Sequence, residues 1–259
     1  MYQTLEYGCE NGVAIARLNR SDKLNALNPA MIAELRELVA AVRADKAVRV
    51  LVITGKGRAF SAGADISRLV EITDAGAAIE FFESIQTAYN ALEDLDRPTI
   101  AAINGLALGG GCELALACDL RIMADSATLG VPEIKIGALP GAGGTQRLAK
   151  MLPPAIAKQM IYFGEPLSSA AALQHGLVNA VVPDASVVDE AIKWARRLAE
   201  LPPIALRCGK TLVHTGINAD LKTGIEAERA ALAFLFSTED RLEGMNAFLQ
   251  KRAPKFSGR

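Results

Sequence analysis

The feature that most constrains the fold is a repeated alternation of short buried-strand patterns with amphipathic helix patterns. Apolar runs bounded by turn residues occur at 13–18, 48–55, 99–105 and 120–124. Between the first two runs, Asn28 is a natural N-cap and Pro29 suits the first helical position. A second helical pattern covers 75–95 and ends before a proline. This alternation predicts an α/β fold with largely parallel, buried strands.

After about residue 185 the pattern changes to helices alone. We therefore expect an α/β core over residues 1–198 and a C-terminal helical region over residues 199–259 that serves oligomer contacts. The sequence has no low-complexity segment and no Pro/Ser-rich linker. The two parts should therefore form one compact unit.

The charge balance bears on the kind of partner. The chain has 28 Lys and Arg against 29 Asp and Glu, with no long run of one sign. A broad surface for nucleic acid or an anionic membrane is therefore not indicated, and a small-molecule ligand is favoured. The N-terminus does not resemble a secretory signal, and no apolar run is long enough to span a bilayer. We expect a soluble protein of the cytoplasm.

Cysteine and histidine residues offer little for catalysis or metal binding. The four cysteines, Cys9, Cys112, Cys118 and Cys208, form no CxxC pair and have no nearby His, which argues against a zinc site or disulfides. His175 and His214 both resemble last-turn positions ahead of a glycine that ends a helix. Hydrolytic triad chemistry and a metal centre are therefore disfavoured.

Three consecutive glycines, at positions 109–111, stand directly before a helical segment. Neither they nor GAGGTQ (141–146) follow the GxGxxG or P-loop patterns, so a nucleotide-phosphate site is not indicated. Free N–H groups at a helix N-terminus can stabilise a developing oxyanion. AFSAGADI (59–66) supplies a second small-residue turn, and two such turns can form an oxyanion hole. Tight strand-to-helix packing is the structural alternative for each glycine cluster.

Two carboxylates stand out beside these turns. Glu113 lies one turn into an otherwise apolar helical segment, and Glu133 lies in a largely apolar loop. A buried carboxylate needs a partner, a water or a function, and a structural salt bridge remains open for each. Desolvation and mutual repulsion of a close pair would raise one pKa, leaving one group able to donate a proton and the other able to accept one.

Three segments together resemble the enoyl-CoA hydratase/isomerase, or crotonase, family: AFSAGADI, AAINGLALGGGCELALACDLRIM and VPEIKIGALPGAGGTQRL. The resemblance extends to GLVNAVVP and to DRLEGMNAFLQKRAPKF near the end of the chain. It implies a crotonase-like spiral of ββα units followed by a C-terminal helical region. It also implies a homo-oligomer, either a trimer or trimers paired into a hexamer.

The resemblance also implies the site. Ala64 and Gly110 match the two amides that bind the thioester oxygen, and Glu113 and Glu133 match the two acids of the family's hydratases. CoA contacts are implied for Lys23, Leu24, Ala26, Ala62, Asp65, Ile66, Phe248 and Lys251, the last two reaching a neighbouring chain. Lys23 and Lys251 also fit ordinary solvated lysines, and Phe248 fits helix packing.

Retention of both glutamates favours reversible hydration of a trans-2-enoyl-CoA to a 3-hydroxyacyl-CoA, as in fatty-acid β-oxidation. No cofactor is expected, because coenzyme A is part of the substrate. The alternatives are a double-bond isomerase of the same superfamily and a non-catalytic RNA-binding relative. The even charge balance supplies no basic stripe for the RNA-binding alternative. The acyl chain and its pathway stay open.

Overall fold

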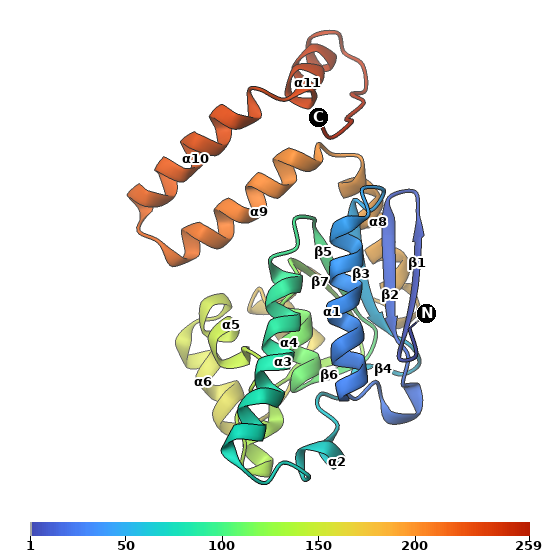
Figure 1. Cartoon of the computed structure of the whole chain (residues 1–259), viewed down its shortest axis with the longest axis vertical. Helices are drawn as coiled ribbons and strands as arrows, with labels where there is room; N and C mark the ends of the chain where they lie inside the picture. The colour runs from blue at the N-terminus through green and yellow to red at the C-terminus, as the bar shows by residue number, and fades with distance from the viewer. Residues whose placement is uncertain (1) are drawn as a thin grey trace.

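Two mixed but largely parallel sheets form the core of the computed structural model, which describes residues 2–259 (Figure 1). The larger sheet has the strand order β1-β2-β3-β5-β7-β10. Only the β1–β2 pair in it is antiparallel. Its strands are β1 (Leu5–Glu10), β2 (Val13–Leu18), β3 (Val50–Gly55), β5 (Thr99–Ile103), β7 (Leu120–Ala124) and β10 (Ala180–Val182).

The smaller sheet has the order β4-β6-β8-β9. Its strands are β4 (Ala59–Ser61), β6 (Leu106–Leu108), β8 (Thr128–Gly130) and β9 (Leu167–Ser168). The chain passes from a strand of the larger sheet to a strand of the smaller sheet and then into a helical segment, three times in succession. This repeat is the expected spiral of ββα units.

The helices of the core are α1 (Pro29–Ala44), α2 (Ile66–Leu69), α3 (Ala75–Glu93), α4 (Gly110–Leu116), α5 (Gly144–Met151), α6 (Pro154–Phe163), α7 (Ser169–Gln174) and α8 (Val187–Ala199). Three short 3-10 segments are η1 (Ser21–Lys23), η2 (Pro132–Ile136) and η3 (Asp184–Ser186). As predicted, α1 begins after Asn28, whose side chain accepts a hydrogen bond from the amide of Met31 at 2.9 Å. Helix α8 packs on β3, β5 and β7, and α1 packs on α3. The central strands β3 and β5 are therefore buried along their whole length.

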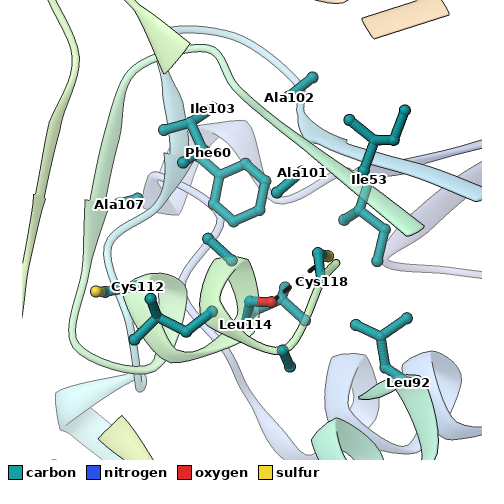
Figure 2. Packing of buried hydrophobic residues seen from close by; sticks show 14 of the residues in the cluster. Ile53, Phe60, Leu92, Ala101, Ala102, Ile103, Ala107, Cys112, Leu114 and Cys118 are labelled. Atoms are coloured by element: carbon teal, nitrogen blue, oxygen red, sulfur yellow. Dashed lines mark hydrogen bonds between the residues drawn. The ribbon is translucent and has the colours of Figure 1, made fainter. Parts of the chain in front are cut away.

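Helix α4 lies inside the core, and all seven of its residues are buried. Its own Cys112 and Leu114 belong to the same buried apolar cluster as Phe60, Ala107 and Cys118 (Figure 2). Burial raises the pKa of Cys118 to about 12, so this thiol stays protonated and packs as a small apolar group. Glu113, which lies on this helix, is therefore surrounded by the buried core.

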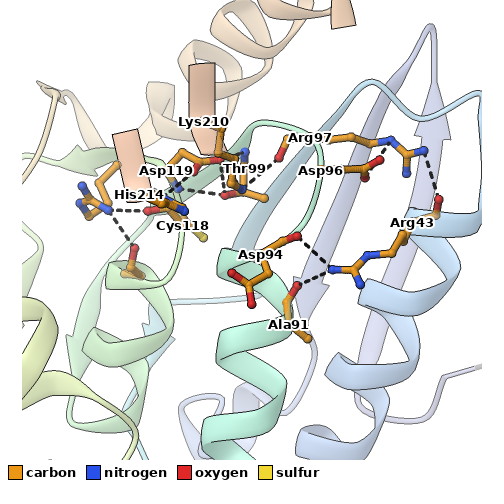
Figure 3. Close-up of polar contacts among 12 residues, drawn as sticks. Arg43, Ala91, Asp94, Asp96, Arg97, Thr99, Cys118, Asp119, Lys210 and His214 are labelled. Atoms are coloured by element: carbon orange, nitrogen blue, oxygen red, sulfur yellow. Dashed lines mark hydrogen bonds and ion pairs between the residues drawn. The ribbon is translucent and has the colours of Figure 1, made fainter. Parts of the chain in front are cut away.

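The C-terminal helices α9 (Pro203–Asn218), α10 (Leu221–Leu235) and α11 (Glu239–Leu249) form an arm that extends away from the core (Figure 1). The side chain of Lys210 anchors it by donating a hydrogen bond to Asp119 at 2.9 Å (Figure 3). Large apolar side chains are exposed along the arm: Val213, Ile217, Leu221, Ile225, Leu232, Phe234, Phe236, Leu242, Met245, Phe248 and Leu249. Exposed apolar patches of this kind are typical of surfaces that bind another protein chain.

The two histidines differ from each other. His175 caps α7 ahead of Gly176, whose φ is +72°, as predicted. The prediction for His214 is wrong, because α9 continues through Gly216 to Asn218. His214 instead faces Asp119, with 3.9 Å between Nε2 and Oδ1. Within residues 2–259, no helix combines the length and apolar character needed to cross a membrane.

Candidate active site

The three consecutive glycines lie where two turns of the spiral meet. Gly109 precedes α4 with φ of +52°, a conformation that disfavours any side chain. A β-carbon at Gly110 would lie 2.8 Å from Cδ1 of Leu27, and one at Gly111 would lie 2.3 Å from the carbonyl oxygen of Ser61. The glycines are therefore required by close approach of the preceding turn.

That preceding turn carries Gly63 and Ala64. A β-carbon at Gly63 would lie 3.1 Å from the amide nitrogen of Gly110, and the amide nitrogen of Ala64 lies 3.6 Å from the corresponding position on Gly110. Leu27 pairs with Ala64 in an isolated parallel bridge that fixes this turn. Within residues 2–259, neither the Ala64 amide nor the Gly110 amide donates a hydrogen bond to a protein acceptor. Two available N–H groups therefore stand close together.

Glu113 is only 2 % exposed, and its Oε1 accepts hydrogen bonds from the amides of Ala142 and Gly144 at 2.8 and 2.7 Å. Burial raises the pKa of this carboxyl, while the two amides and the positive charge of Arg147 act in the opposite direction. The GAGGTQ loop thus holds the carboxylate by its backbone. The salt-bridge alternative is not observed for Glu113, because its direct partners are these amides.

Glu133 belongs to η2 and lies against the glycine turn. Its Oε1 lies 2.7 Å from the position that a β-carbon on Gly109 would take, and its buried Oε2 has no hydrogen-bond partner within residues 2–259. Desolvation raises its pKa to about 7, and the nearby charge of Glu113 adds to the shift. At neutral pH this carboxyl therefore exists in both protonation states, which suits a group that donates and accepts protons.

The segments around Leu24 and Ala62 form one wall beside these turns. The amide of Ala62 donates to the carbonyl of Leu24 at 2.9 Å, and the amide of Leu27 donates to the carbonyl of Gly63 at 2.8 Å. Leu24 has φ of +51°, and Ala26 and Ala62 are half-buried. The predicted contact segments thus lie side by side.

Three other predicted contacts lie at the edges of this wall. Lys23 is exposed on η1, and Ile66 is 51 % exposed at the start of α2. Asp65 pairs with Arg20, with 3.1 Å between Oδ2 and Nη2. Asp65 therefore has a structural partner within the chain, whereas Lys23 and Ile66 are available to a ligand.

Phe248 and Lys251 do not join the site within one chain. Phe248 is 84 % exposed on α11, and Lys251 follows that helix with φ of +53°. Helix α11 and helix α2 lie at opposite ends of the molecule (Figure 1). These two side chains can therefore reach a site of this kind only on another copy of the chain.

The sequence analysis did not identify several groups that contact Glu113, the loop around it or the glycine turn at Gly110. Ala142 and Gly144 bind Glu113, and Arg147 donates from Nη1 to the carbonyl of Ala142 at 2.9 Å. Tyr89 donates its hydroxyl hydrogen to the carbonyl of Gly110 at 2.7 Å. The arginine directly following GAGGTQ and the tyrosine on the apolar side of the 75–95 helix pattern were the available signals.

The structure is an α/β spiral of ββα units, and its candidate site brings two carboxyls of raised pKa near two amides that donate to no protein acceptor within residues 2–259. The comparison with known sequences makes the class specific, because the pattern of the family described as enoyl-CoA hydratase/isomerase matches residues 8–259. The chain belongs to this family.

Individual relatives agree over nearly the full chain. It is 40 % identical to a crotonyl-CoA hydratase of Syntrophomonas wolfei, covering 98 % of both chains. It is also 40 % identical to the 2,3-dehydroadipyl-CoA hydratase of Escherichia coli, covering 95 % of this chain and 96 % of the relative. The crystal structure of an enoyl-CoA hydratase from Bacillus anthracis superposes with a TM-score of 0.96 at 39 % identity, covering 99 % of this chain and 100 % of that one.

Proposed function

We propose that the protein is an enoyl-CoA hydratase, which adds water reversibly across the trans-2 double bond of an enoyl-CoA thioester to give a 3-hydroxyacyl-CoA. The observation that carries this proposal is the placement of Glu113 and Glu133 beside two unused amides, with the pKa of both carboxyls raised. The relatives named as hydratases support the same reaction.

In this mechanism the amides of Ala64 and Gly110 donate hydrogen bonds to the thioester oxygen. Negative charge gathers on that oxygen as water adds, so donors fixed by the backbone stabilise the transition state more than the substrate. Glu113 removes a proton from water as its oxygen bonds to C3, and Glu133 gives a proton to C2. The double bond becomes single, no net proton is consumed, and the two carboxyls have exchanged roles.

The test is the loss of enoyl-thioester absorbance when crotonyl-CoA is mixed with the purified protein. Hydration removes this absorbance, and Glu113→Gln or Glu133→Gln should slow it by about 10²-fold or more in kcat. A protein that shifts the double bond of a 3-enoyl-CoA but leaves crotonyl-CoA unchanged is an isomerase, and full turnover by either variant refutes the assigned roles. A panel of enoyl-CoAs, from four carbons to aryl chains, then defines the acyl group.

The assembly is part of the proposal. Exposed apolar side chains on α9–α11 support a homo-oligomer, a trimer or a dimer of trimers, in which Phe248 and Lys251 contact CoA bound to a neighbouring subunit. Lys23, Leu24, Ala26, Ala62, Asp65 and Ile66 border the CoA path within the same subunit. Coenzyme A enters as part of the substrate and no further cofactor takes part. We place the enzyme in the cytoplasm and in fatty-acid β-oxidation.

A further inference from the structure

Helix α3 contacts both halves of the site through one short stretch of its sequence. Tyr89 is 1 % exposed, and its hydroxyl donates to the carbonyl of Gly110 at 2.7 Å. Its oxygen also lies 3.7 Å from the position of a β-carbon on Gly110. The phenol therefore fixes the residue whose amide is assigned to the thioester oxygen.

Side chains from the same stretch of α3 bind Arg147, which lies on α5 and is 7 % exposed. The Nη2 of Arg147 donates to the Oδ1 of Asn90 at 2.9 Å, and its Nε donates to the Oε2 of Glu93 at 3.1 Å. Tyr89, Asn90 and Glu93 all lie near the C-terminal end of α3, within five consecutive positions. The guanidinium therefore has a fixed orientation relative to Tyr89.

Arg147 also binds the loop whose amides hold the Glu113 carboxylate. Its Nη1 donates to the carbonyl of Ala142 at 2.9 Å and lies 2.3 Å from the position of a β-carbon on Gly143, whose φ is +102°. The residues on either side of Gly143 are Ala142 and Gly144, the two whose amides bind the Glu113 carboxylate. The guanidinium of Arg147 therefore packs against the loop so closely that Gly143 has no room for a side chain.

We propose that Tyr89 and Arg147 are positioning residues, by which α3 sets the oxyanion-binding amide of Gly110 and the carboxylate of Glu113 in fixed relation to each other. This inference rests on the proposed function for the roles of Gly110 and Glu113. Both side chains are buried and bond to protein groups, so the proposal assigns neither a contact with the substrate. Both act on the transition state because a misplacement of about 1 Å in a catalytic group can cost about 10²-fold in rate.

The first test is Tyr89→Phe, which removes one hydroxyl and keeps the ring. We expect kcat for crotonyl-CoA to fall about tenfold, with KM changed by less than about threefold, because the lost contact acts mainly in the transition state. Ser169→Ala is the matched control, since Ser169 also donates a buried hydroxyl hydrogen to a backbone carbonyl, that of Asp125 at 2.6 Å. It should lower the melting temperature and leave kcat unchanged.

The second test is Arg147→Lys, which keeps the charge but loses the planar fork. We expect a fall of about tenfold or more in kcat. Arg43→Lys is the control, because the Nη2 of Arg43 donates to the carbonyls of both Ala91 and Asp94 at the end of the same helix without contacting the loop at 142–144 (Figure 3). Wild-type kcat in folded Tyr89→Phe and Arg147→Lys proteins would overturn the proposal.

A spectroscopic readout separates this proposal from the proposed function. Bound acetoacetyl-CoA forms an enolate that absorbs in the near ultraviolet, and its yield reports how strongly the amides stabilise an oxyanion without any turnover. Tyr89→Phe should weaken the enolate band, whereas Ser169→Ala should not. Failure of the wild type to hydrate any enoyl-CoA refutes the proposed function alone, whereas an undiminished band in Tyr89→Phe refutes the positioning role.

Discussion

Glu133 lies against Gly109, with Oε1 of the glutamate 2.7 Å from the place where a β-carbon on the glycine would stand. Gly109→Ala should therefore push the carboxyl away from the glycine turn. We expect kcat to fall by about 10²-fold. The positive φ of +52° should also cost stability, on the order of 1–3 kcal/mol. Steady-state kinetics and urea unfolding measure the two effects.

Gly176→Ala separates backbone strain from displacement of the acid. Gly176 also has positive φ, +72°, but a β-carbon there would meet nothing within 4 Å. This variant should lose stability and keep the wild-type kcat. Equal kinetic defects in both variants would show that strain, and not the contact with Glu133, causes the loss.

The pH dependence of kcat/KM should be bell-shaped. Catalysis in the proposed mechanism needs one proton on the pair, with Glu133 protonated and Glu113 ionised before hydration. Because the pKa of Glu133 is raised to about 7, kcat/KM should fall as pH rises above that value. It should fall on the acid side as Glu113 is protonated, at a pH above the ordinary value of 4.5.

The reverse reaction provides the check on this assignment. Hydration of a double bond consumes no net proton, so dehydration of 3-hydroxybutyryl-CoA must show the same two limbs in kcat/KM. In Glu113→Gln the negative charge that helps to raise the pKa of Glu133 is gone, so the basic limb of the residual activity should move to lower pH. An unmoved basic limb would argue that another group controls it.

Glu133→Gln should stabilise the protein while it lowers kcat by about 10²-fold or more. The carboxyl titrates near 4.5 when unfolded and near 7 when folded. Between these values the folded state holds a proton that the unfolded state has released, so stability falls as pH rises from about 4.5 to about 7. At pH 8 the variant should be more stable by on the order of 1–2 kcal/mol, discounted for partial exposure of the carboxyl. A similar gain in urea unfolding at pH 4.5 would contradict this origin.

Four strands of the larger sheet, β2, β3, β5 and β7, could be predicted because their apolar runs have five or six residues. The other two strands of that sheet, β1 and β10, were not predicted. Residues 13–18 and 120–124 were predicted as strands and match β2 and β7. The strands β4, β6 and β8 have three residues each, too few for a periodicity to register, and they appear only because they pair with one another. The ββα repeat therefore came from the family resemblance and not from the hydrophobic pattern.

The candidate site was predictable where chemistry is visible in residue type. Glu113 and Glu133 stood out as carboxylates in apolar surroundings, and glycines marked the turns. The contacts that orient them could not be read in the same way, because Tyr89 looks like any core aromatic residue on an amphipathic helix. Tyr89 is far in sequence from Gly110, and Glu93 is far from Arg147. The fold brings each pair into contact, so neither contact could be predicted from the sequence pattern.

The anchor of the arm can be tested through Lys210. The Oδ2 of Asp119 accepts from Lys210 and from the amide and hydroxyl of Thr99 at 2.7–2.9 Å (Figure 3). Lys210→Met leaves this largely buried carboxylate without its cation, and stability should fall by about 1–3 kcal/mol. Lys222→Met on exposed α10 is the control and should be nearly neutral. Equal melting temperatures for the two variants would show that the pair does not anchor the arm.

The contribution of the arm to a neighbouring site can be tested by mixing subunits. The double variant Phe248→Ala with Lys251→Ala should raise KM for the enoyl-CoA substrate and leave kcat nearly unchanged, since helix α11 lies far from helix α4 of its own chain (Figure 1). Glu113→Gln should instead lower kcat by about 10²-fold or more. Oligomers reassembled from both variant chains contain some sites that pair an intact Glu113 with an intact arm of a neighbour. Those sites should recover low-KM activity that neither parent shows, whereas sites completed within one chain would recover none.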